Sequence, residues 1–485
     1  MSSTNQALTV ETMNQNIRQA EYAVRGAVVA KAAEMKKRIA EGDKTVPFDR
    51  TIPCNIGNPQ VVGQKPITYY RQVAAICTYP ALMESSEFPE DVKAAAQYYL
   101  DGSNGVGTGG YTMSPGLPCI RKQVAAYIER RDGYPCDTER LFLTTGASEG
   151  IKRVMDMIIA KPGVDGVLLP CPQYPLYSCA LTMNGGRYDY YYLKEEDGWS
   201  VSQQELQTSY DRAVSEGMNL KAIAVINPGN PCGSVLSEED IRGIITFARD
   251  HNLLIMADEV YQENIYTERK FYSFKKILRD LQKENPGKFD LVQLVSFHST
   301  SKGLLGECGQ RGGYMELVGF DEPTIAQFNK VAASCLSSNT LGQIFVGLMC
   351  TPPPENGPSY PLFKQERQNI YDGLKRRAEA ISQEFNKIEG MSCQRVQGAM
   401  YAFVNIELPK KATEAAKARG FASADVMYCL DLVEQTGIVC VPGNGFKEVE
   451  GTNHFRITIL PPDDMMKEMI GKLADFHKNF LAKYH

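Results

Sequence analysis

The chain has 485 residues, too many for one simple hydrophobic core, and this length favours two domains. A formal net charge of −5, with no basic stripe carrying interleaved aromatic residues, argues against a nucleic-acid-binding protein. Thirteen cysteines scattered singly along the chain argue against a secreted disulfide framework and against a zinc site, and they favour a reducing compartment.

The N-terminal region predicts one long helix. Apolar residues recur at helical spacing over residues 14–41, and Gly42 follows as a stop. The first residues lack the apolar stretch of a secretory signal, and the first twenty hold only Arg18 as a base, which is unlike a mitochondrial presequence. No run of about 18 apolar residues predicts a membrane span. We therefore expect a cytoplasmic protein, with a mitochondrial location left open.

The middle of the chain alternates between predicted strands and helices. An irregular stretch at 51–70 precedes helices expected at 71–82, 89–101 and 117–131. Short apolar runs then predict strands at 140–144, 166–170, 188–193, 221–226, 253–257 and 291–297. Helices are expected between several of them, at 148–160, 204–216, 238–251 and 275–284. This alternation predicts an α/β fold, with a mostly parallel sheet covered by helices on both faces.

The last part of the chain has a different pattern. Beyond residue 320 it is mainly helical, with strand-like pieces near 392–406 and 454–460, and the Pro-rich segment at 352–360 predicts a joint between domains. We expect an active site between two domains, at the carboxyl ends of the parallel strands. The expected division is a helical arm at 1–44, a large cofactor-binding domain at 91–350, and a smaller α+β domain made of 45–90 and 351–485.

A lysine in a turn rich in Ser, Thr and Gly is the central chemical motif. Lys302 follows the apolar run at 291–297, in a segment that also holds Ser299, Ser301 and Arg311. A lone lysine there would be a surface charge, but these neighbours are residue types that hold a phosphate. A lysine beside a phosphate site suits either a phosphate clamp or a Schiff base. No GxxxxGK[ST] loop is present, so the segment does not predict a nucleotide P-loop.

A second motif, LIMADEVYQ at 254–262, places Asp258 at the end of an apolar strand and Tyr261 three residues later. Taken alone, the pair is typical of a helix cap or a strand-end turn. The functional interpretation is that Asp258 faces a pyridinium nitrogen and Tyr261 donates a hydrogen bond to the phenolic oxygen of the same ring. An acid at that nitrogen keeps it protonated, and a protonated ring is the better electron acceptor.

Three more turns follow strand ends. INPGNPCG (226–233) holds Asn230, which can bond a ring oxygen and a substrate carboxylate. LTTGASEGI (143–151) opens a helix at Ala147 and Ser148, whose free backbone N–H groups suit a phosphate. CPQYPLY (171–177) puts Tyr174 between prolines, where an aromatic ring can stack on a flat cofactor, although burial alone explains it equally well.

Two other patterns are weaker. GVGTGG at 105–110 satisfies GxGxxG, but it follows polar residues rather than a strand and lacks the later acidic residue, which argues against a dinucleotide site. His298 lies at a strand end, where a structural role is favoured over that of a catalytic base.

The order of these motifs resembles that of the fold-type I pyridoxal-phosphate enzymes, over nearly the whole chain. Within that family, three stretches resemble the alanine aminotransferases: NIGNPQVVGQKPITYYRQV (55–73), SNGVGTGGYTMSPG (103–116) and SKGLLGECGQRGGY (301–314). GECG after the lysine is the most specific of these signs. Residues 304–305 are Leu-Leu, where an aromatic residue followed by Met is expected, and this difference concerns packing near the cofactor.

The resemblance implies a role for each site residue. Lys302 attaches pyridoxal 5′-phosphate and moves the proton, Asp258 pairs with the ring nitrogen, and Tyr261 and Asn230 bond the ring oxygen. Arg456 grips the substrate carboxylate, helped by Gly57 and Asn230. Tyr174 stacks on the ring, and Tyr111 reaches the cofactor phosphate of a partner subunit in a homodimer. The residues that hold the chain's own phosphate are Ala147, Ser148, Ser299, Ser301 and Arg311.

The resemblance further implies a reversible transfer of an amino group between L-alanine and 2-oxoglutarate, with small amino and keto acids as the binding partners. Rival readings are a lyase of the aminocyclopropane-carboxylate synthase kind, an aminotransferase for larger side chains, a non-catalytic binding protein on the same fold, and a dehydrogenase. The presence of Lys302 and Arg456 weighs against the non-catalytic protein. The residue that binds the distal carboxylate of glutamate is not identified by the sequence.

Overall fold

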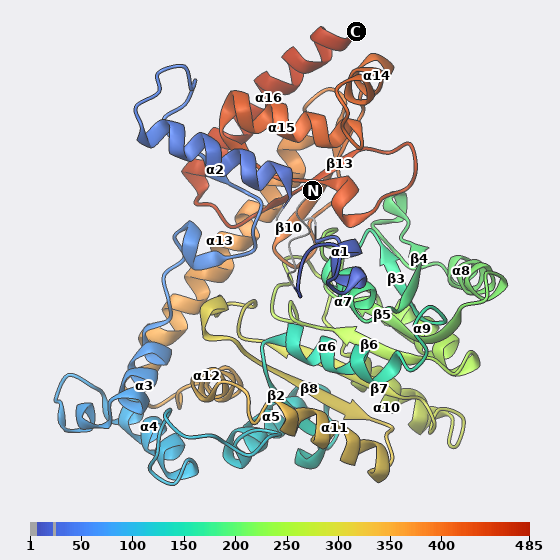
Figure 1. Ribbon diagram of the computed structural model, residues 1–485. Helices are drawn as coiled ribbons and strands as arrows, with labels where there is room; N and C mark the ends of the chain where they lie inside the picture. The colour runs from blue at the N-terminus through green and yellow to red at the C-terminus, as the bar shows by residue number, and fades with distance from the viewer. Residues whose placement is uncertain (1–6, 23–25) are drawn as a thin grey trace.

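A computed structural model describes residues 7–22 and 26–485 (Figure 1). The predicted single helix at 14–41 is wrong, and its residues 23–25 lie outside the described part. The region instead holds α1 (Gln15–Gln19) and α2 (Ala27–Ala40). Helix α1 ends because Ala20 is extended, with ψ 125°, and α2 begins after Gly26, whose backbone is also extended. Helix α2 buries its apolar stripe against α15 near the other end of the chain.

Short elements and helices lead into the main sheet. The predicted helices at 71–82, 89–101 and 117–131 are confirmed with shifted bounds, as α3, α4 and α5. The elements of this region are β1 (Ile52–Pro53), η2 (Pro59–Val62), α3 (Thr68–Thr78), η3 (Pro80–Glu84), α4 (Glu90–Gly102), α5 (Pro118–Asp132) and η4 (Thr138–Arg140).

The main sheet has seven strands in the described residues, in the order β2-β8-β7-β6-β5-β3-β4. Strands β3 to β7 run parallel, and β8 pairs antiparallel with both β7 and β2. The sequence analysis did not predict β8, which follows Arg311 directly. The strands are β2 (Leu141–Thr145), β3 (Asp165–Cys171), β4 (Arg187–Tyr192), β5 (Asn219–Ile226), β6 (Leu254–Asp258), β7 (Leu294–Ser299) and β8 (Gly312–Val318).

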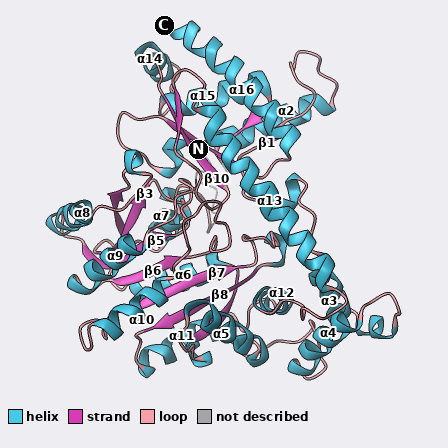
Figure 2. Cartoon of the chain, turned by 180° about the vertical axis from the view of Figure 1, so that it is seen from behind, coloured by secondary structure: helices cyan, strands magenta, loops and turns pink. Residues whose placement is uncertain are grey.

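Helices cover both faces of this sheet, as the α/β prediction requires (Figures 1 and 2). One apolar cluster joins α8, α9 and α10 to one face, and another joins α6, α7 and α11 to the other. Side chains of Ser202, Ser237, Ser273 and Asp321 cap α8 to α11. The elements are α6 (Ala147–Ile158), α7 (Leu176–Met183), η5 (Glu195–Asp197), α8 (Gln203–Ser215), α9 (Glu238–Asp250), α10 (Phe274–Glu284), η6 (Cys308–Gln310), α11 (Glu322–Ser334) and α12 (Thr340–Cys350).

A second sheet is built from the C-terminal part. In the described residues it has four antiparallel strands in the order β12-β13-β10-β9, and the long helix α13 runs from α3 to α16 alongside it (Figure 2). Strand β1 pairs with β11, which joins the two chain ends. The elements are α13 (Tyr360–Phe385), β9 (Met391–Cys393), β10 (Tyr401–Ile406), α14 (Lys410–Ala418), α15 (Ala424–Thr436), β11 (Ile438–Val439), β12 (Val441–Pro442), η7 (Gly443–Phe446), β13 (His454–Thr458) and α16 (Asp463–Tyr484).

Candidate active site

A cavity of about 400 Å³ lies at the carboxyl ends of β5, β6 and β7, where the main sheet faces the second sheet. Ligands of open α/β sheets bind at this edge, because the loops that follow parallel strands meet there. The predicted residues that line the cavity are Gly57, Ala147, Ser148, Tyr174, Asn230, Asp258, Tyr261, Ser299, Ser301, Lys302, Arg311 and Arg456. Segments far apart in the sequence thus converge on one site.

Lys302 lies just after β7, and its Nζ donates a hydrogen bond to the carbonyl oxygen of Gly57, 2.6 Å away. Position 57 has no room for a side chain, because a Cβ there would lie 2.0 Å from Tyr401 Oη. Glycine therefore lets the backbone come close to both the lysine and the Tyr401 ring. Tyr401 also lines the cavity, and its hydroxyl accepts a hydrogen bond from Tyr261 at 3.2 Å.

One end of the cavity is built to receive an anion. Ala147 and Ser148 form the first turn of α6, whose backbone N–H groups have no partners within the helix. Arg311 adopts a left-handed backbone conformation, with φ 56°, and its Nη1 donates to Ser301 Oγ at 3.3 Å. Ser299 lies beside them at the end of β7. A positive guanidinium, two hydroxyls and a helix N-terminus together suit a phosphate group.

Asp258 ends β6 and lies buried on the cavity floor. Burial raises the pKa of its carboxyl to about 6, against hydrogen bonds from the backbone of Val260 and from the Tyr177 hydroxyl, the latter 3.1 Å long. A cation placed against this carboxylate would therefore gain a strong partner. Tyr177 lies in the CPQYPLY segment, where the sequence pattern indicates a role for Tyr174 alone.

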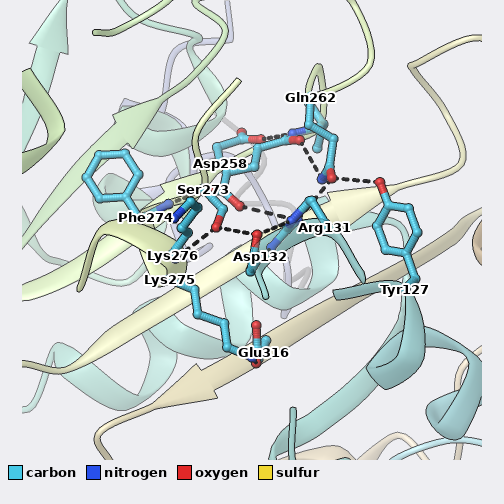
Figure 3. Close-up of polar contacts among 12 residues, drawn as sticks. Tyr127, Arg131, Asp132, Asp258, Gln262, Ser273, Phe274, Lys275, Lys276 and Glu316 are labelled. Atoms are coloured by element: carbon cyan, nitrogen blue, oxygen red, sulfur yellow. Dashed lines mark hydrogen bonds and ion pairs between the residues drawn. The ribbon is translucent and has the colours of Figure 1, made fainter. Parts of the chain in front are cut away.

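A network of polar side chains anchors the turn formed by Asp258–Tyr261 (Figure 3). Gln262 Oε1 accepts hydrogen bonds from Tyr127 at 2.8 Å and from Arg131 at 2.9 Å, both on α5. Gln262 Nε2 donates to the carbonyl oxygen of Glu259, at 3.2 Å, within the turn itself. Arg131 also pairs with Asp132, which accepts from Ser273 at the start of α10. The turn is thus fixed to two helices before any ligand binds.

Arg456 is almost completely buried, with 1% of its surface exposed. Its Nη1 donates to Asn230 Oδ1 at 3.0 Å and its Nη2 to the carbonyl oxygen of Asn55 at 2.6 Å. The guanidinium carbon lies 4.1 Å from the Tyr401 ring centre and 4.7 Å from that of Phe446. Its Nε has no hydrogen-bond partner anywhere in residues 7–22 and 26–485. The residue lines the cavity, so a guanidinium is available there for a carboxylate ligand.

Tyr174 lines the cavity, and its hydroxyl lies 2.7 Å from that of Tyr22. Tyr22 follows α1, which packs against α7, so the N-terminal segment crosses the cavity mouth. The sequence analysis missed Tyr22 because it placed this residue inside one long helix. Tyr401 also lines the cavity, and no local pattern in its segment indicates a ligand. Cys308 lines it too and lies in the GECG stretch after Lys302, where the sequence assigns it no role.

Two residues singled out from the sequence lie elsewhere. Tyr111 is 82% exposed and does not line the cavity of its own chain. His298 is buried in β7 and points away from the cavity that its neighbour Ser299 lines, since successive strand side chains alternate. Burial lowers the pKa of His298 to about 3. The imidazole therefore stays neutral, and it lies outside the site, as a structural residue would.

The residues present fit pyridoxal 5′-phosphate. The anion-binding end matches its phosphate, the buried Asp258 carboxylate matches its ring nitrogen, and the aromatic face of Tyr174 matches its flat ring. Lys302 Nζ would supply an amine for its aldehyde. Arg456, which also lines the cavity, suits a second ligand that carries a carboxylate.

The known proteins that this chain resembles are aminotransferases. The family "Aminotransferase class I and II" matches residues 78–473. An alanine aminotransferase 2-like protein of Danio rerio is 46% identical over 481 residues, covering 98% of this chain and 86% of the relative. Glutamate–glyoxylate aminotransferase 2 of Arabidopsis thaliana is 44% identical over 483 residues, covering 99% and 97%. Some relatives, including one from Dictyostelium discoideum, are named as mitochondrial.

Solved structures show the same fold. An alanine aminotransferase from Pyrococcus furiosus superposes with a TM-score of 0.75 at 23% identity, over 96% of this chain and 100% of that one. At that level of identity the likeness concerns the fold alone.

Proposed function

The chain belongs to the class I and II aminotransferases, and we propose that it transfers the amino group of L-alanine to 2-oxoglutarate, giving pyruvate and L-glutamate. The observation that carries this proposal is the convergence of Lys302, Asp258 and Arg456 on one cavity of a size suited to a cofactor and a small amino acid. Relatives named for alanine, matching nearly the whole chain, support the choice of substrate.

The cofactor supplies an aldehyde that holds the amino group and a ring that stores an electron pair. Asp258 keeps the ring nitrogen protonated, and Tyr261 and Asn230 orient the ring oxygen. Arg456, which lines the cavity, would bind the α-carboxylate and hold the amino acid beside Lys302. Lys302 Nζ would then take the α-proton of the amino acid and hold it for return to the bound molecule. Because one keto acid leaves before the next arrives, we expect ping-pong kinetics.

A panel of single half-reactions tests the substrates. We expect alanine and glutamate to convert the cofactor absorbance of the purified enzyme, whereas aspartate and phenylalanine react far more slowly. In the reverse half-reaction, pyruvate and 2-oxoglutarate should restore the original spectrum. Glyoxylate belongs in the panel because a relative of equal similarity carries it in its name. A clear preference for aspartate or an aromatic amino acid over alanine would contradict the proposed substrates and leave the family unchanged.

We further propose a homodimer in which Tyr111 binds the phosphate in the partner's site. Its side chain is exposed, and the same loop exposes Val106 by 60% and Met113 by 59%. Thr340 Oγ1 donates to the carbonyl oxygen of Gly110 at 3.1 Å, and the nearby Leu336 is also exposed. Apolar side chains gathered on a protruding loop favour burial against another surface.

Mixing two inactive variants tests this arrangement. Lys302→Ala lacks the amine, and Tyr111→Glu places a negative charge where the phosphate would bind, so each homodimer should be inactive. A heterodimer has one complete site, and random pairing should therefore restore about a quarter of the wild-type activity. Lys302→Ala mixed with itself is the control. No recovery despite proven subunit exchange, or full activity of a monomer in sedimentation, would refute the shared site.

We also propose the division into two domains and a cytoplasmic location. The main sheet within 141–318, the second sheet within 391–458 and the pairing of β1 with β11 support a large domain and a small domain made of both chain ends.

All thirteen cysteines are free thiols, which supports a reducing compartment such as the cytoplasm. No helix in the described residues is long and apolar enough to cross a membrane. Fractionation of cells that express a tagged chain distinguishes cytoplasm from mitochondria.

A further inference from the structure

A buried histidine lies between two carboxylates at the junction of the two sheets, outside the cavity of Lys302. His454 Nδ1 is 2.7 Å from Glu448 Oε2, and His454 Nε2 is 3.0 Å from Glu195 Oε2. The imidazole also stacks on Phe403, with ring centroids 4.5 Å apart and planes within 2°. The Asn405 amide nitrogen also lies 3.1 Å from His454 Nε2. A carboxylate at each ring nitrogen favours the cation, in which both nitrogens donate.

The two carboxylates come from different parts of the chain. Glu195 opens η5, just after the edge strand of the main sheet, whereas Glu448 follows η7 beside the second sheet. An apolar cluster spans the same junction and consists of Trp199, Cys232, Phe403, Val441 and Phe446. His454 is therefore the charged centre of a contact that fixes one sheet against the other.

This contact lies next to Arg456 in the second sheet. His454 and Arg456 are two residues apart in β13, so their side chains point to the same face. Phe403, which stacks on His454, is the cross-strand partner of Arg456. The ring centre of Phe446 lies 4.7 Å from the guanidinium carbon of Arg456. Any shift of β13 relative to the main sheet would thus move Arg456 away from Asn230, which belongs to that sheet's loops.

The charge on His454 follows from its neighbours. Burial by itself lowers the pKa of His454, but the hydrogen bonds to Glu195 and Glu448 outweigh it and raise that pKa to about 9. Burial raises the pKa of Glu448 to about 7, and His454 opposes that rise while Asp425 adds to it. Because the folded pKa of His454 exceeds its ordinary value, the stabilisation contributed by its protonation is complete below about pH 6.5 and is lost as the pH rises through about 9. Glu448 takes up a proton below about pH 7, so its charge no longer faces His454 there.

We propose that His454 is a positioning residue: as a cation held between Glu195 and Glu448, it fixes the strand that carries Arg456 and so sets the geometry in which Arg456 binds the substrate carboxylate. The inference rests on the proposed function, because it takes Arg456 as the carboxylate ligand. It assigns to Glu195, which lies outside the cavity, an effect on substrate binding.

Binding of propionate to the holoenzyme tests the proposal. Propionate is alanine without its amino group, so calorimetry measures the carboxylate contact without turnover. Glu195→Gln keeps the size of the side chain and removes its charge, and we expect it to raise the dissociation constant about fivefold to tenfold. The matched control is Glu196→Gln, one residue along and exposed, which should bind propionate as the wild type does. Equal binding by the two variants would overturn the proposal.

The pH dependence separates positioning from a general loss of structure. For the wild type, the dissociation constant should rise above about pH 9, where His454 loses its proton. In Glu195→Gln this rise should begin about one pH unit lower, because one of the two carboxylates that raise the pKa is gone. His454→Gln should bind propionate weakly and lack the rise altogether. A profile that is identical in all three proteins would refute the role of His454.

This experiment can fail independently of the proposed substrates. If the half-reaction panel shows no reaction with alanine while propionate binding follows the expected profile, the substrate proposal is wrong and the positioning role stands. If alanine reacts but propionate binding ignores Glu195 and His454, the positioning role is wrong and the proposed reaction stands.

Discussion

Replacing Lys302 with alanine should lower the rate of amino transfer by about 10²–10⁴-fold or more, because the positioned proton carrier is lost. Among the residues that line the described cavity, Lys302 is the one with a side-chain amine. The other two cations there, Arg311 and Arg456, are guanidinium groups, which do not give up their protons in proteins. No neighbour can therefore take over, and single-turnover absorbance measurements with alanine would show the loss.

A control variant and two further experiments test this prediction. Lys270→Ala, at an exposed lysine, should leave the rate unchanged and serves as the control. Added methylamine should restore part of the activity of Lys302→Ala, since the cavity is large enough to admit a small amine. Borohydride reduction of the wild type should attach the cofactor permanently to its lysine, and peptide mapping should then find it on Lys302. A label on any other lysine would invalidate the assignment.

Arg456→Lys should lower kcat/KM by roughly 100-fold for alanine and glutamate together, because hydrogen bonds to a charged group contribute about 1.5–3 kcal/mol each. Lysine keeps the charge but loses the planar fork that reaches Asn230, the Asn55 carbonyl and the substrate at once. Steady-state kinetics with both donors, alongside the exposed Arg395→Lys as control, gives the comparison. A loss confined to glutamate would mean that Arg456 binds the distal carboxylate instead.

The sequence predicts which residues meet at this cavity because the motifs follow strand ends. Asn230, Asp258 and Ser299 come directly after or at the ends of neighbouring parallel strands, and such ends must meet at one edge of the sheet. Local patterns of apolar runs and turn residues are enough to place them. The family resemblance then supplies the roles that the positions alone do not give.

The parts that the sequence did not predict depend on contacts between distant segments. Tyr22 and Tyr401 enter the cavity from opposite ends of the chain, and neither lies in a local pattern typical of a ligand. Strand β8 was missed because its two glycines hide the apolar run that follows Arg311. The Gln262 network was missed because it joins α5 to a turn formed far later in the chain.

The antiparallel strand β8 also has a consequence for how the protein is made. Strand β2, which leads into the helix that would hold the phosphate, reaches the rest of the sheet through β8, since Leu141 pairs with Glu316. At a synthesis rate of about 5–20 residues per second, β2 leaves the ribosome on the order of ten seconds or more before its partner. During that interval the nascent chain has an open strand edge and an incomplete phosphate cradle. Cofactor capture must therefore follow the emergence of β8, and chaperones have the earlier segment to protect.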